Sequence, residues 1–347
     1  MFAVFGRAFD FALSSSLNLA VAQYVDDFPQ VEPKALANSA AHAMDSFFEI
    51  VGWRLKDLPP EKKGFHRRFE ALGVQFDFSK ADKGIIEVRQ KEGRLQALED
   101  ERLKIMSRGV ARGPELDSLR SRISYCRCQT FGGMGAHLLR NLSDLAKEVL
   151  VRAEGPLENV LREAVELLKV ARPRTIRGGT RKLPPVILCT DGSQEEKTGI
   201  GATLWDPHTG KKECFGAIVK EHVVKFWRGD QGERTIHQAE LFPTRLAFEH
   251  WHRDLHGREV LEFIDNDAAR AALVNGLSGN ALSARIVHET WLEAARAGSS
   301  PWFARVSSPA NSVDGPSRGD FSWCRGYGYR VVPLQEVAGF QDGLQEW

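Results

Sequence analysis

The stretch from Leu183 to Ser193, LPPVILCTDGS, limits the possible folds most, because it is an apolar strand that ends on a carboxylate. Asp191 comes directly after the apolar run, and a glycine and a hydroxyl residue follow it. Three further acids come downstream, each at the end of an apolar segment or on a helix face: Glu240, Asp265 and Asp314. The C-terminal half is therefore expected to fold around an acidic cluster.

The segments between these acids predict a mixed sheet with helices packed against it. GIGATLW and KKECFGAIV flank a turn at 206–210, so the first three strands should be antiparallel neighbours. A helix carrying Glu240 follows, and Pro243 either kinks it or lies in its first turn. A strand at 260–264, a helix after Asp265, a helix at 281–297 and a last strand, WFARV, complete an α/β domain.

Acids at strand ends and on the first helix would converge on one edge of this sheet. Two divalent ions about 4 Å apart can stabilise both the attacking water and the leaving oxygen in phosphodiester hydrolysis. Carboxylates are the natural ligands of Mg²⁺ or Mn²⁺. Crowded acids also repel one another, so without cations the cluster should hold protons tightly. The competing interpretation gives each acid an ordinary structural role: turn residue (Asp191), helix-surface acid (Glu240), N-cap (Asp265) and loop acid (Asp314).

Over about 186–332 these pieces resemble the ribonuclease H family, in the form attached to retroelement reverse transcriptases. The matching pieces are TDGS, QAEL, FIDNDAA and NSVDGPSRG. The resemblance implies four catalytic, metal-binding carboxylates: Asp191, Glu240, Asp265 and Asp314. It also implies that Ser193 and Asn266 contact an RNA/DNA hybrid, whose RNA strand is hydrolysed with two Mg²⁺ or Mn²⁺ ions. Asp267 is a rival for the third position, although Asp265 ends the apolar strand more directly.

Near the N-terminus, an acidic pair lies at the tip of a predicted hairpin. The alternation from Leu17 to Val21 predicts a strand, which leads through the tetrapeptide YVDD into a weak return strand. Asp26 and Asp27 could hold Mg²⁺ or could simply be turn residues. Pro29 cannot donate a ladder hydrogen bond, so the return strand should lie at a sheet edge.

The order of the first 90 residues resembles the second half of a reverse-transcriptase palm. YVDD matches the acidic catalytic hairpin of that family, GWRLKDLPPEKK resembles the segment with a catalytic lysine, and FEALGVQF the primer-holding hairpin. The resemblance implies metal binding by Asp26 and Asp27, with Lys62 or Lys63 near an incoming triphosphate. The fingers and an earlier metal-binding aspartate have no counterpart before the hairpin. We therefore expect no polymerase activity from this chain alone, unless a separate chain supplies the missing fingers and palm half.

From about residue 91 to 170, four apolar stripes at helical spacing predict a helical region in the position of a thumb or connection. Pro156 is well placed to open its last helix. A basic linker at 171–185 follows, and its Arg177, Arg181 and Lys182 either contact a phosphate backbone or are simply solvated.

Composition limits the remaining classes of function. The 347 residues suggest about two domains, and a net charge of +1 means that any nucleic-acid contact must be local. Five cysteines without a C-x-x-C pair argue against a cysteine zinc site and a disulfide framework, and fit a cytoplasmic or nuclear location. No apolar run approaches the roughly 20 residues of a membrane span. The tryptophans from Trp205 to Trp323 either include a base-stacking platform or pack in the core.

The leading hypothesis is a truncated retroelement polymerase of α/β class. It has a partial palm (1–90), a helical thumb or connection (91–170), the basic linker (171–185), a ribonuclease H-like domain (186–332) and a tail (333–347). The alternative is a non-catalytic nucleic-acid-binding relic of such a polymerase.

Overall fold

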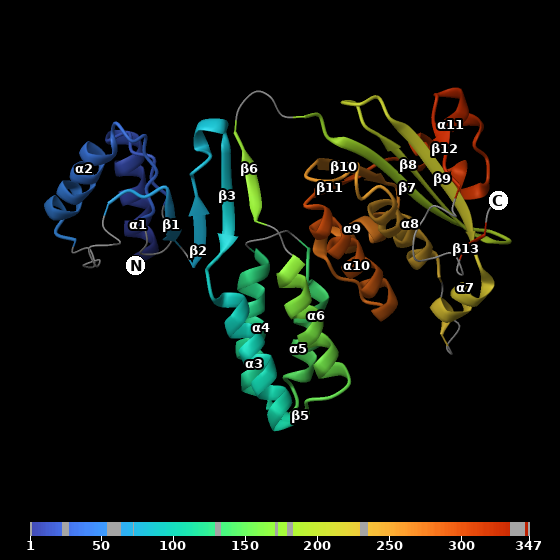
Figure 1. The fold of residues 1–347 in the computed structure, drawn as a ribbon, viewed down its shortest axis with the longest axis horizontal. Helices are drawn as coiled ribbons and strands as arrows, with labels where there is room; N and C mark the ends of the chain where they lie inside the picture. The colour runs from blue at the N-terminus through green and yellow to red at the C-terminus, as the bar shows by residue number, and fades with distance from the viewer. Residues whose placement is uncertain are drawn as a thin grey trace. The chain divides into compact units, whose positions relative to one another are not determined.

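The computed structural model describes residues 2–22, 28–53, 64–71, 73–128, 133–170, 173–178, 183–229, 235–333 and 344–345 (Figure 1). These residues form two compact units. The first is Met1–Lys91 with Thr175–Gly178, and the second is Glu92–Arg174 with Gly179–Trp347. Within the described ranges, no helix is both long enough and apolar enough to cross a membrane.

In its described residues, the first unit combines two α-helices with a four-stranded sheet. The helices are α1 (Phe2–Phe11), which continues into a π-helical turn (Ala12–Ser16), and α2 (Ala37–Ile50). The strands, in sheet order, are β1 (Arg68–Ala71), β2 (Val74–Asp77), β3 (Ile85–Gln90) and β6 (Arg174–Arg177). The segment FEALGVQF thus forms the antiparallel hairpin β1/β2, in which the rings of Phe69 and Phe76 stack.

The strand predicted at Leu17–Val21 does not form. Asn18 has a φ of 56°, and a residue in this left-handed region interrupts an extended strand. The chain nevertheless runs antiparallel here through an isolated bridge between Val21 and Gln30, and Ala22 N donates to Pro29 O at 3.0 Å. Asp26 and Asp27 lie outside the described residues, as do Lys62 and Lys63.

The predicted basic linker contains a strand that the sequence interpretation did not include. Residues Arg174–Arg177 form β6 beside β3, and all four are exposed. β-Branched Thr175 and Ile176 favour the extended conformation, and an edge position needs no buried side chain. Arg177 is therefore an exposed residue of this edge strand, whereas Arg181 and Lys182 lie outside the described residues.

The N-terminal part of the second unit is helical, as predicted. Its helices are α3 (Arg94–Arg108), α4 (Gly113–Cys128), α5 (Ala136–Leu145) and α6 (Pro156–Val170). The last helix begins at Pro156, the residue predicted to open it. A short antiparallel pair, β4 (Val110–Arg112) and β5 (Leu150–Arg152), joins the ends of these helices.

The rest of the second unit is the predicted mixed sheet with flanking helices. Along the main path of the sheet the order is β11, β10, β7, β8, β9, β12, and β13 pairs with β9. The strands are β7 (Val186–Gln194), β8 (Thr198–Trp205), β9 (Lys212–Val219), β10 (Glu259–Ile264), β11 (Ser300–Arg305), β12 (Arg330–Val331) and β13 (Leu344–Gln345). As predicted, β7, β8 and β9 are antiparallel neighbours, while β10 and β11 run parallel to β7.

Among the described residues, five helices accompany this sheet. They are α7 (Glu221–Arg228), α8 (Ile236–His250), α9 (Asp267–Asn275), α10 (Ala281–Ala297) and α11 (Ser322–Gly326). Helix α8 packs against β7 and β8, and α10 packs against α8. Pro243 lies in the interior of α8, not in its first turn.

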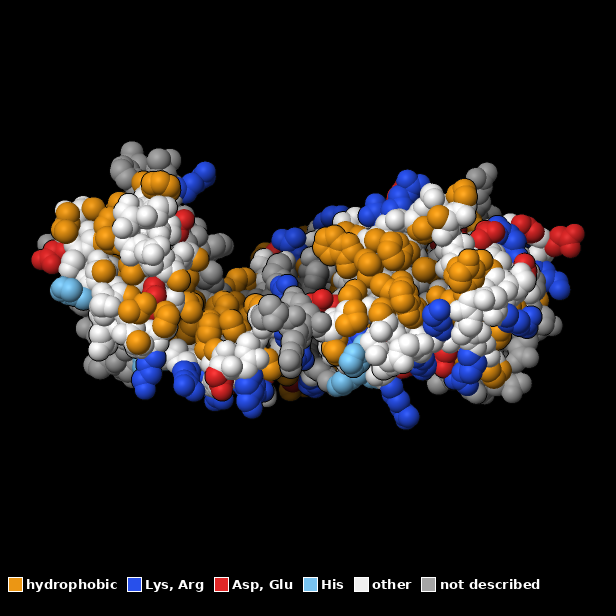
Figure 2. All heavy atoms as spheres, turned by 90° about the horizontal axis from the view of Figure 1, so that it is seen from above, with side chains coloured by type: hydrophobic (Ala, Val, Ile, Leu, Met, Phe, Trp, Pro, Cys, Tyr) orange, Lys and Arg blue, Asp and Glu red, His pale blue; other side chains and the backbone are white. Residues whose placement is uncertain are grey.

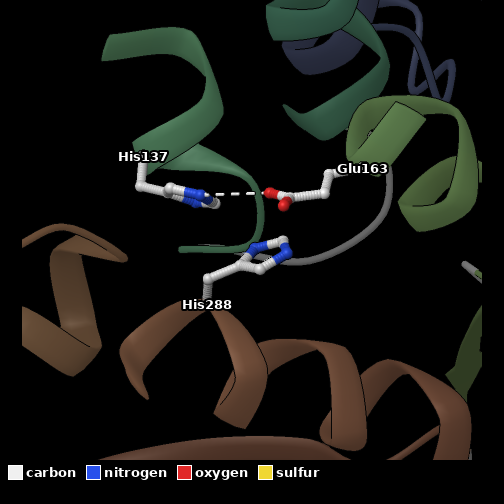
Figure 3. A group of neighbouring side chains, drawn as sticks. All are labelled: His137, Glu163 and His288. Atoms are coloured by element: carbon white, nitrogen blue, oxygen red, sulfur yellow. Dashed lines mark ion pairs between the residues drawn. The ribbon is translucent and has the colours of Figure 1, made fainter. Parts of the chain in front are cut away.

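The helical region and the sheet domain share one hydrophobic core. Buried leucines of α5 and α6 belong to the same cluster as Val287 and Trp291 of α10. The backbones of the two parts also meet: a Cβ added to Gly276, after α9, would lie 1.6 Å from the carbonyl oxygen of Gly133. Where the helical region packs on α10, three polar side chains of α5, α6 and α10 face one another (Figure 3).

Hydrophobic side chains remain at the surface, as Figure 2 shows on one face of the molecule. Among the tryptophans, Trp227, Trp251 and Trp291 are buried, as the core interpretation predicts, whereas Trp302 on β11 is 73% exposed. Trp323 is exposed, and its ring centroid lies 4.6 Å from that of Tyr327.

Candidate metal and catalytic site

Two of the predicted acids are placed side by side by the parallel register of β7 and β10. Phe263 pairs with Cys189, and two residues further along each chain, on the same face, come Asp265 and Asp191. Strand β10 ends at Ile264, just before Asp265. The sequence folds this way because apolar residues hold both strands in the middle of the sheet and the acids follow where the hydrophobic run stops.

Asn266, and not Asp265, caps the helix that follows. Its side chain accepts hydrogen bonds from the backbone N–H groups of Ala268 and Ala269, each at 3.0 Å. The structural alternative that made Asp265 an N-cap is therefore wrong. The carboxylate of Asp265 is left available to the acidic cluster, and its buried Oδ1 has no hydrogen-bond partner among the described residues.

Glu240 reaches the cluster because Gly192 lets α8 cross β7 at very short range. A Cβ added to Gly192 would lie 2.3 Å from the carbonyl oxygen of Ala239, so any side chain there would push the helix away. Glu240 is the next residue, and Gly192 N donates to its Oε2 at 3.4 Å. The amide of Asn266 donates to its Oε1, also at 3.4 Å.

Asp191, Glu240 and Asp265 each place one carboxylate oxygen within 4.8 Å of the others. Asp191 and Glu240 are 4% and 8% exposed. Burial, followed by the charges of Asp191 and Asp265, raises the pKa of Glu240 to about 8. Burial also raises the pKa of Asp191 to about 6, with contributions from the charges of Asp265 and Asp314 and an opposing hydrogen bond from Ser317. Negative charge is thus costly in this group.

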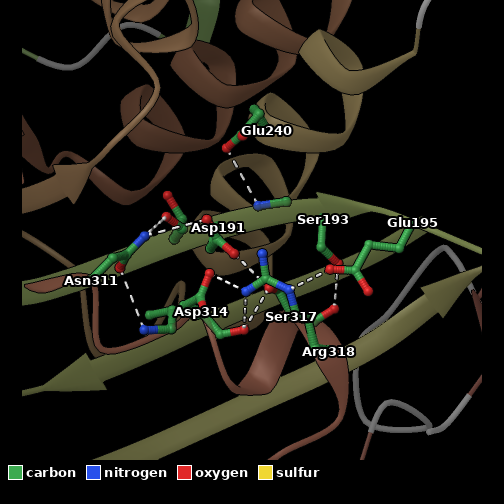
Figure 4. Close-up of polar contacts among 11 residues, drawn as sticks. Asp191, Ser193, Glu195, Glu240, Asn311, Asp314, Ser317 and Arg318 are labelled. Carbon is green, nitrogen blue, oxygen red and sulfur yellow. Dashed lines mark hydrogen bonds and ion pairs between the residues drawn. The ribbon is translucent and has the colours of Figure 1, made fainter. Parts of the chain in front are cut away.

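A C-terminal segment holds Asp191 from the other side (Figure 4). The amide of Asn311 donates to its Oδ1 at 3.3 Å. The hydroxyl of Ser317 lies 2.5 Å from its Oδ2 and 2.9 Å from the backbone oxygen of Asp314. Both residues belong to the segment NSVDGPSRG, but their support of Asp191 was not part of the sequence prediction.

Two glycines form the surface on which this segment lies. Gly201 on β8 pairs with Asp191 on β7 and with Gly216 on β9, so the three residues form a row across the sheet. A Cβ added to Gly216 would lie 2.2 Å from the carbonyl oxygen of Pro316, and one added to Gly201 would lie 2.7 Å from Ser317 N. The absence of side chains at Gly201 and Gly216 therefore brings Ser317 within reach of Asp191.

Asp314, the predicted fourth ligand, is close to this group but does not belong to it. Its carboxylate forms an ion pair with Arg318, and its side chain is 53% exposed. Arg318 also donates to Glu195 at 3.1 Å. Asp267, the rival for the third position, forms ion pairs with Arg305 at 3.3 Å and Arg270 at 3.5 Å. Asp265 is the third acid of the cluster.

The residues predicted to contact an RNA/DNA hybrid differ in their burial and in their hydrogen-bond partners. The hydroxyl of Ser193 is buried and donates to the backbone oxygen of Ser317 at 2.7 Å. Asn266 is half-buried and is engaged with Glu240 and the start of α9. Contact of these two side chains and of Arg177 with nucleic acid stays a prediction.

Sequence interpretation also missed a buried acid on the α8 side of the sheet. Glu262 of β10 is fully buried, and its Oε1 accepts hydrogen bonds from Thr244 at 2.7 Å and Thr190 at 2.9 Å. Burial raises its pKa to about 7. Its Oε2 has no partner among the described residues. The segment EVLEFI reads as an ordinary strand, so its sequence gave no signal for this role.

The acidic group fits a divalent cation. All of its potential ligands are carboxylate oxygens, which Mg²⁺ and Mn²⁺ prefer. A bound cation would offset the repulsion that raises the pKa values of Asp191 and Glu240, and it would give the buried Oδ1 of Asp265 a partner.

Comparison with known proteins adds a partial structural likeness. No family model matches the chain, and no curated protein matches it. Among solved structures, the chain is similar to ribonuclease H1 from the halophilic archaeon Halobacterium salinarum NRC-1, with 16% identity and a TM-score of 0.30. This likeness covers 38% of the present chain and 94% of that chain. From its own geometry, the second unit contains a mixed α/β sheet whose three clustered acids can hold divalent metal.

Proposed function

We propose that this chain is a metal-dependent nuclease of the ribonuclease H type, which hydrolyses the RNA strand of RNA/DNA hybrids. The convergence of Asp191, Glu240 and Asp265 within 4.8 Å carries the proposal. These acids are 25 to 74 positions apart in the sequence, so only the fold brings them together. The surrounding residues orient them, as a site for charge stabilisation requires.

In this proposal Mg²⁺ or Mn²⁺ is held by the three clustered carboxylates, with Asp314 as the fourth acid. Two such ions supply Lewis-acid stabilisation of the charge that develops during phosphodiester hydrolysis. Ser317 and Asn311 fix the carboxylate of Asp191 through hydrogen bonds to its two oxygens. Participation of Asp314 requires its ion pair with Arg318 to open.

The proposed substrate is recognised through its backbone and 2′-hydroxyl groups and not through its base sequence. Because the net charge of the whole chain is only +1, contacts with the substrate backbone must be local. Single-stranded RNA and duplex DNA of the same sequence are therefore the substrate controls.

The test is cleavage of a labelled RNA/DNA hybrid by the purified full chain in Mg²⁺ and in Mn²⁺. Asp191→Asn should lower the rate on the order of 100-fold or more, because several kcal/mol of metal-dependent stabilisation are lost. Asp267→Asn is the matched control, since this neighbouring acid pairs with arginines outside the cluster. Equal cleavage by wild type and Asp191→Asn, or none by either, contradicts the proposal.

One observation favours the alternative, a non-catalytic nucleic-acid-binding protein. Asp314 is engaged with Arg318 and lies outside the group of three acids. In that case the chain should bind the hybrid with a steep salt dependence and hydrolyse nothing in either metal.

The proposal extends to the first unit as the second half of a reverse-transcriptase palm from a retroelement. The hairpin β1/β2 at FEALGVQF and the antiparallel pairing of Val21 with Gln30 support it. Primer extension should appear only when a second chain supplies fingers and the other half of the palm. It should disappear in Asp26→Asn and Asp27→Asn variants. Extension that persists in both variants contradicts the extended proposal.

A further inference from the structure

Two histidines and a glutamate meet where the helical region packs on α10 (Figure 3). His137 comes from α5, Glu163 from α6 and His288 from α10. His137 Nε2 lies 3.6 Å from a carboxylate oxygen of Glu163, and the two imidazole rings are 4.3 Å apart between centroids. One potential ligand atom from each residue lies within 4.8 Å of the other two.

The protein alone leaves this group incompletely satisfied. His288 is 7% exposed. The Nδ1 atoms of both His137 and His288 are buried, and neither has a hydrogen-bond partner among the described residues. Leaving a buried polar atom without a partner costs about 1–3 kcal/mol, so the orphan Nδ1 of His288 beside this carboxylate calls for an explanation.

A simple hydrogen-bonded pair does not provide that explanation. The contact between His137 and Glu163 uses Nε2 of His137 and leaves Nδ1 of His288 without a partner among the described residues. The chemical state of the group suits metal binding better. Burial lowers the pKa of His288 to about 3, which keeps its imidazole neutral. The contact with His137 lowers the pKa of Glu163, which keeps it a carboxylate. Metal ligands must be deprotonated in this way.

We propose that His137, Glu163 and His288 bind a divalent transition-metal ion of the zinc type, which ties α5 and α6 to α10. Two imidazoles and a carboxylate are a common zinc ligand set, with a water in the fourth position. Zinc bonds of about 2.0–2.2 Å place tetrahedral ligands about 3.4 Å apart. The distance of 3.6 Å between His137 and Glu163 is already close to that value. Side-chain rotations would have to shorten the other distances between ligand atoms, which lie within 4.8 Å.

This site differs in chemistry from the acidic cluster. The cluster of Asp191, Glu240 and Asp265 offers only oxygen ligands, which suit Mg²⁺, whereas imidazole nitrogens favour Zn²⁺. The two sites can therefore be filled and tested independently. A zinc site that fails says nothing against the proposed nuclease, and the reverse also holds.

The expected role of the ion is structural. It would join helices from segments 151 residues apart, at a contact that an ion pair between Arg296 and Glu166 at 3.2 Å already supports. Arg140, on α5, likewise donates to the backbone oxygen of Ser278 at 3.2 Å. Binding only to the folded state should raise the melting temperature by roughly 5–10 °C at a zinc concentration about 100-fold above Kd.

The experiment uses the full chain with Asp191→Asn and Glu240→Gln, so that the acidic cluster does not compete for the probe. After chelation and dialysis, we expect one equivalent of Zn²⁺ to bind, measured by titration calorimetry and elemental analysis. Co²⁺ in its place should give the visible absorption of a tetrahedral nitrogen and oxygen site. His288→Gln and Glu163→Gln should each weaken binding by more than about 100-fold, beyond the loss of an outer-shell partner.

His222→Gln, which changes an exposed histidine on α7, is the matched control and should bind zinc as before. Because His288 is buried, its variant is checked for folding by circular dichroism. Glu163, whose side chain is 39% exposed, provides a second variant that should fold normally. Failure to bind one equivalent of zinc overturns the proposal, as does equal affinity in the Glu163→Gln variant and the control.

Discussion

Glu240→Gln should stabilise the metal-free protein at alkaline pH and have little effect at acidic pH. The site holds the pKa of Glu240 at about 8, against an ordinary value of 4.5, mainly because the carboxyl is buried beside Asp191 and Asp265. At pH 5 the folded protein keeps this carboxyl protonated, so glutamine is a close substitute. At pH 9 the carboxylate is charged in an unfavourable site, whereas glutamine is not.

The magnitude follows from the change in pKa on folding. A rise from 4.5 to about 8 is a difference of about 3.5, and each pH unit corresponds to about 1.4 kcal/mol, which gives an upper value of about 5 kcal/mol. Water that enters around the charged group reduces this free-energy difference, so we expect the variant to be more stable by about 2–4 kcal/mol at pH 9. The direction is fixed: the unfolded chain releases this proton at lower pH than the folded protein does. Stability of the wild type therefore falls as pH rises from about 4.5 through 8.

Urea denaturation in the presence of a chelator, at pH 5 and at pH 9, measures this effect. Glu262 also has a raised pKa, but wild type and variant share it. The charge of Asp191 acts on Glu240, so the difference between the two proteins reports Glu240 together with its interaction with Asp191. Glu221→Gln, at an exposed position of α7, is the control. Addition of Mg²⁺ should stabilise the wild type at pH 9 and not the variant. The same difference in unfolding free energy at both pH values would refute the reasoning.

Two further substitutions test how the cluster is built. Gly192→Ala places a Cβ 2.3 Å from the carbonyl oxygen of Ala239, so α8 must move. We expect the free energy of unfolding to fall by about 1–3 kcal/mol and Mg²⁺ binding to weaken. Gly279→Ala, where the added Cβ meets open space, is the control and should change neither property. Ser317→Ala removes the hydrogen bond that lowers the pKa of Asp191, so this pKa rises above about 6. Calorimetry should then show about tenfold weaker Mg²⁺ binding, with a larger loss of affinity at pH 6 than at pH 8. An equal loss of affinity at both pH values would contradict the proposed support of Asp191 by Ser317.

Local patterns predicted the elements that carry the acids. Apolar periodicity predicts α10 at 281–297, and the structure adds the side chain of Asn280 as its cap and Gly298 as its left-handed end. The turn at 206–210 predicts the antiparallel order of β7, β8 and β9. These features depend on neighbours along the chain, which a sequence displays directly.

Features that depend on contacts across the fold were not predictable in this way. Gly192, Gly201 and Gly216 read as ordinary strand glycines, and only the packed structure shows that each makes room for a neighbouring segment. His137 and His288 lie 151 positions apart, so no spacing connects them. At Asn18, one residue with positive φ was enough to replace a predicted strand by an irregular segment.

The continuous core between the four helices and α10 has a practical consequence for anyone dissecting this molecule. A fragment beginning near residue 183 would expose Val287 and Trp291 to water and should aggregate. A protease cut between α6 and β7, by contrast, would leave two pieces that stay associated, since apolar packing holds them together without the peptide link. The sheet with its acids is thus inseparable in solution from the helices that precede it.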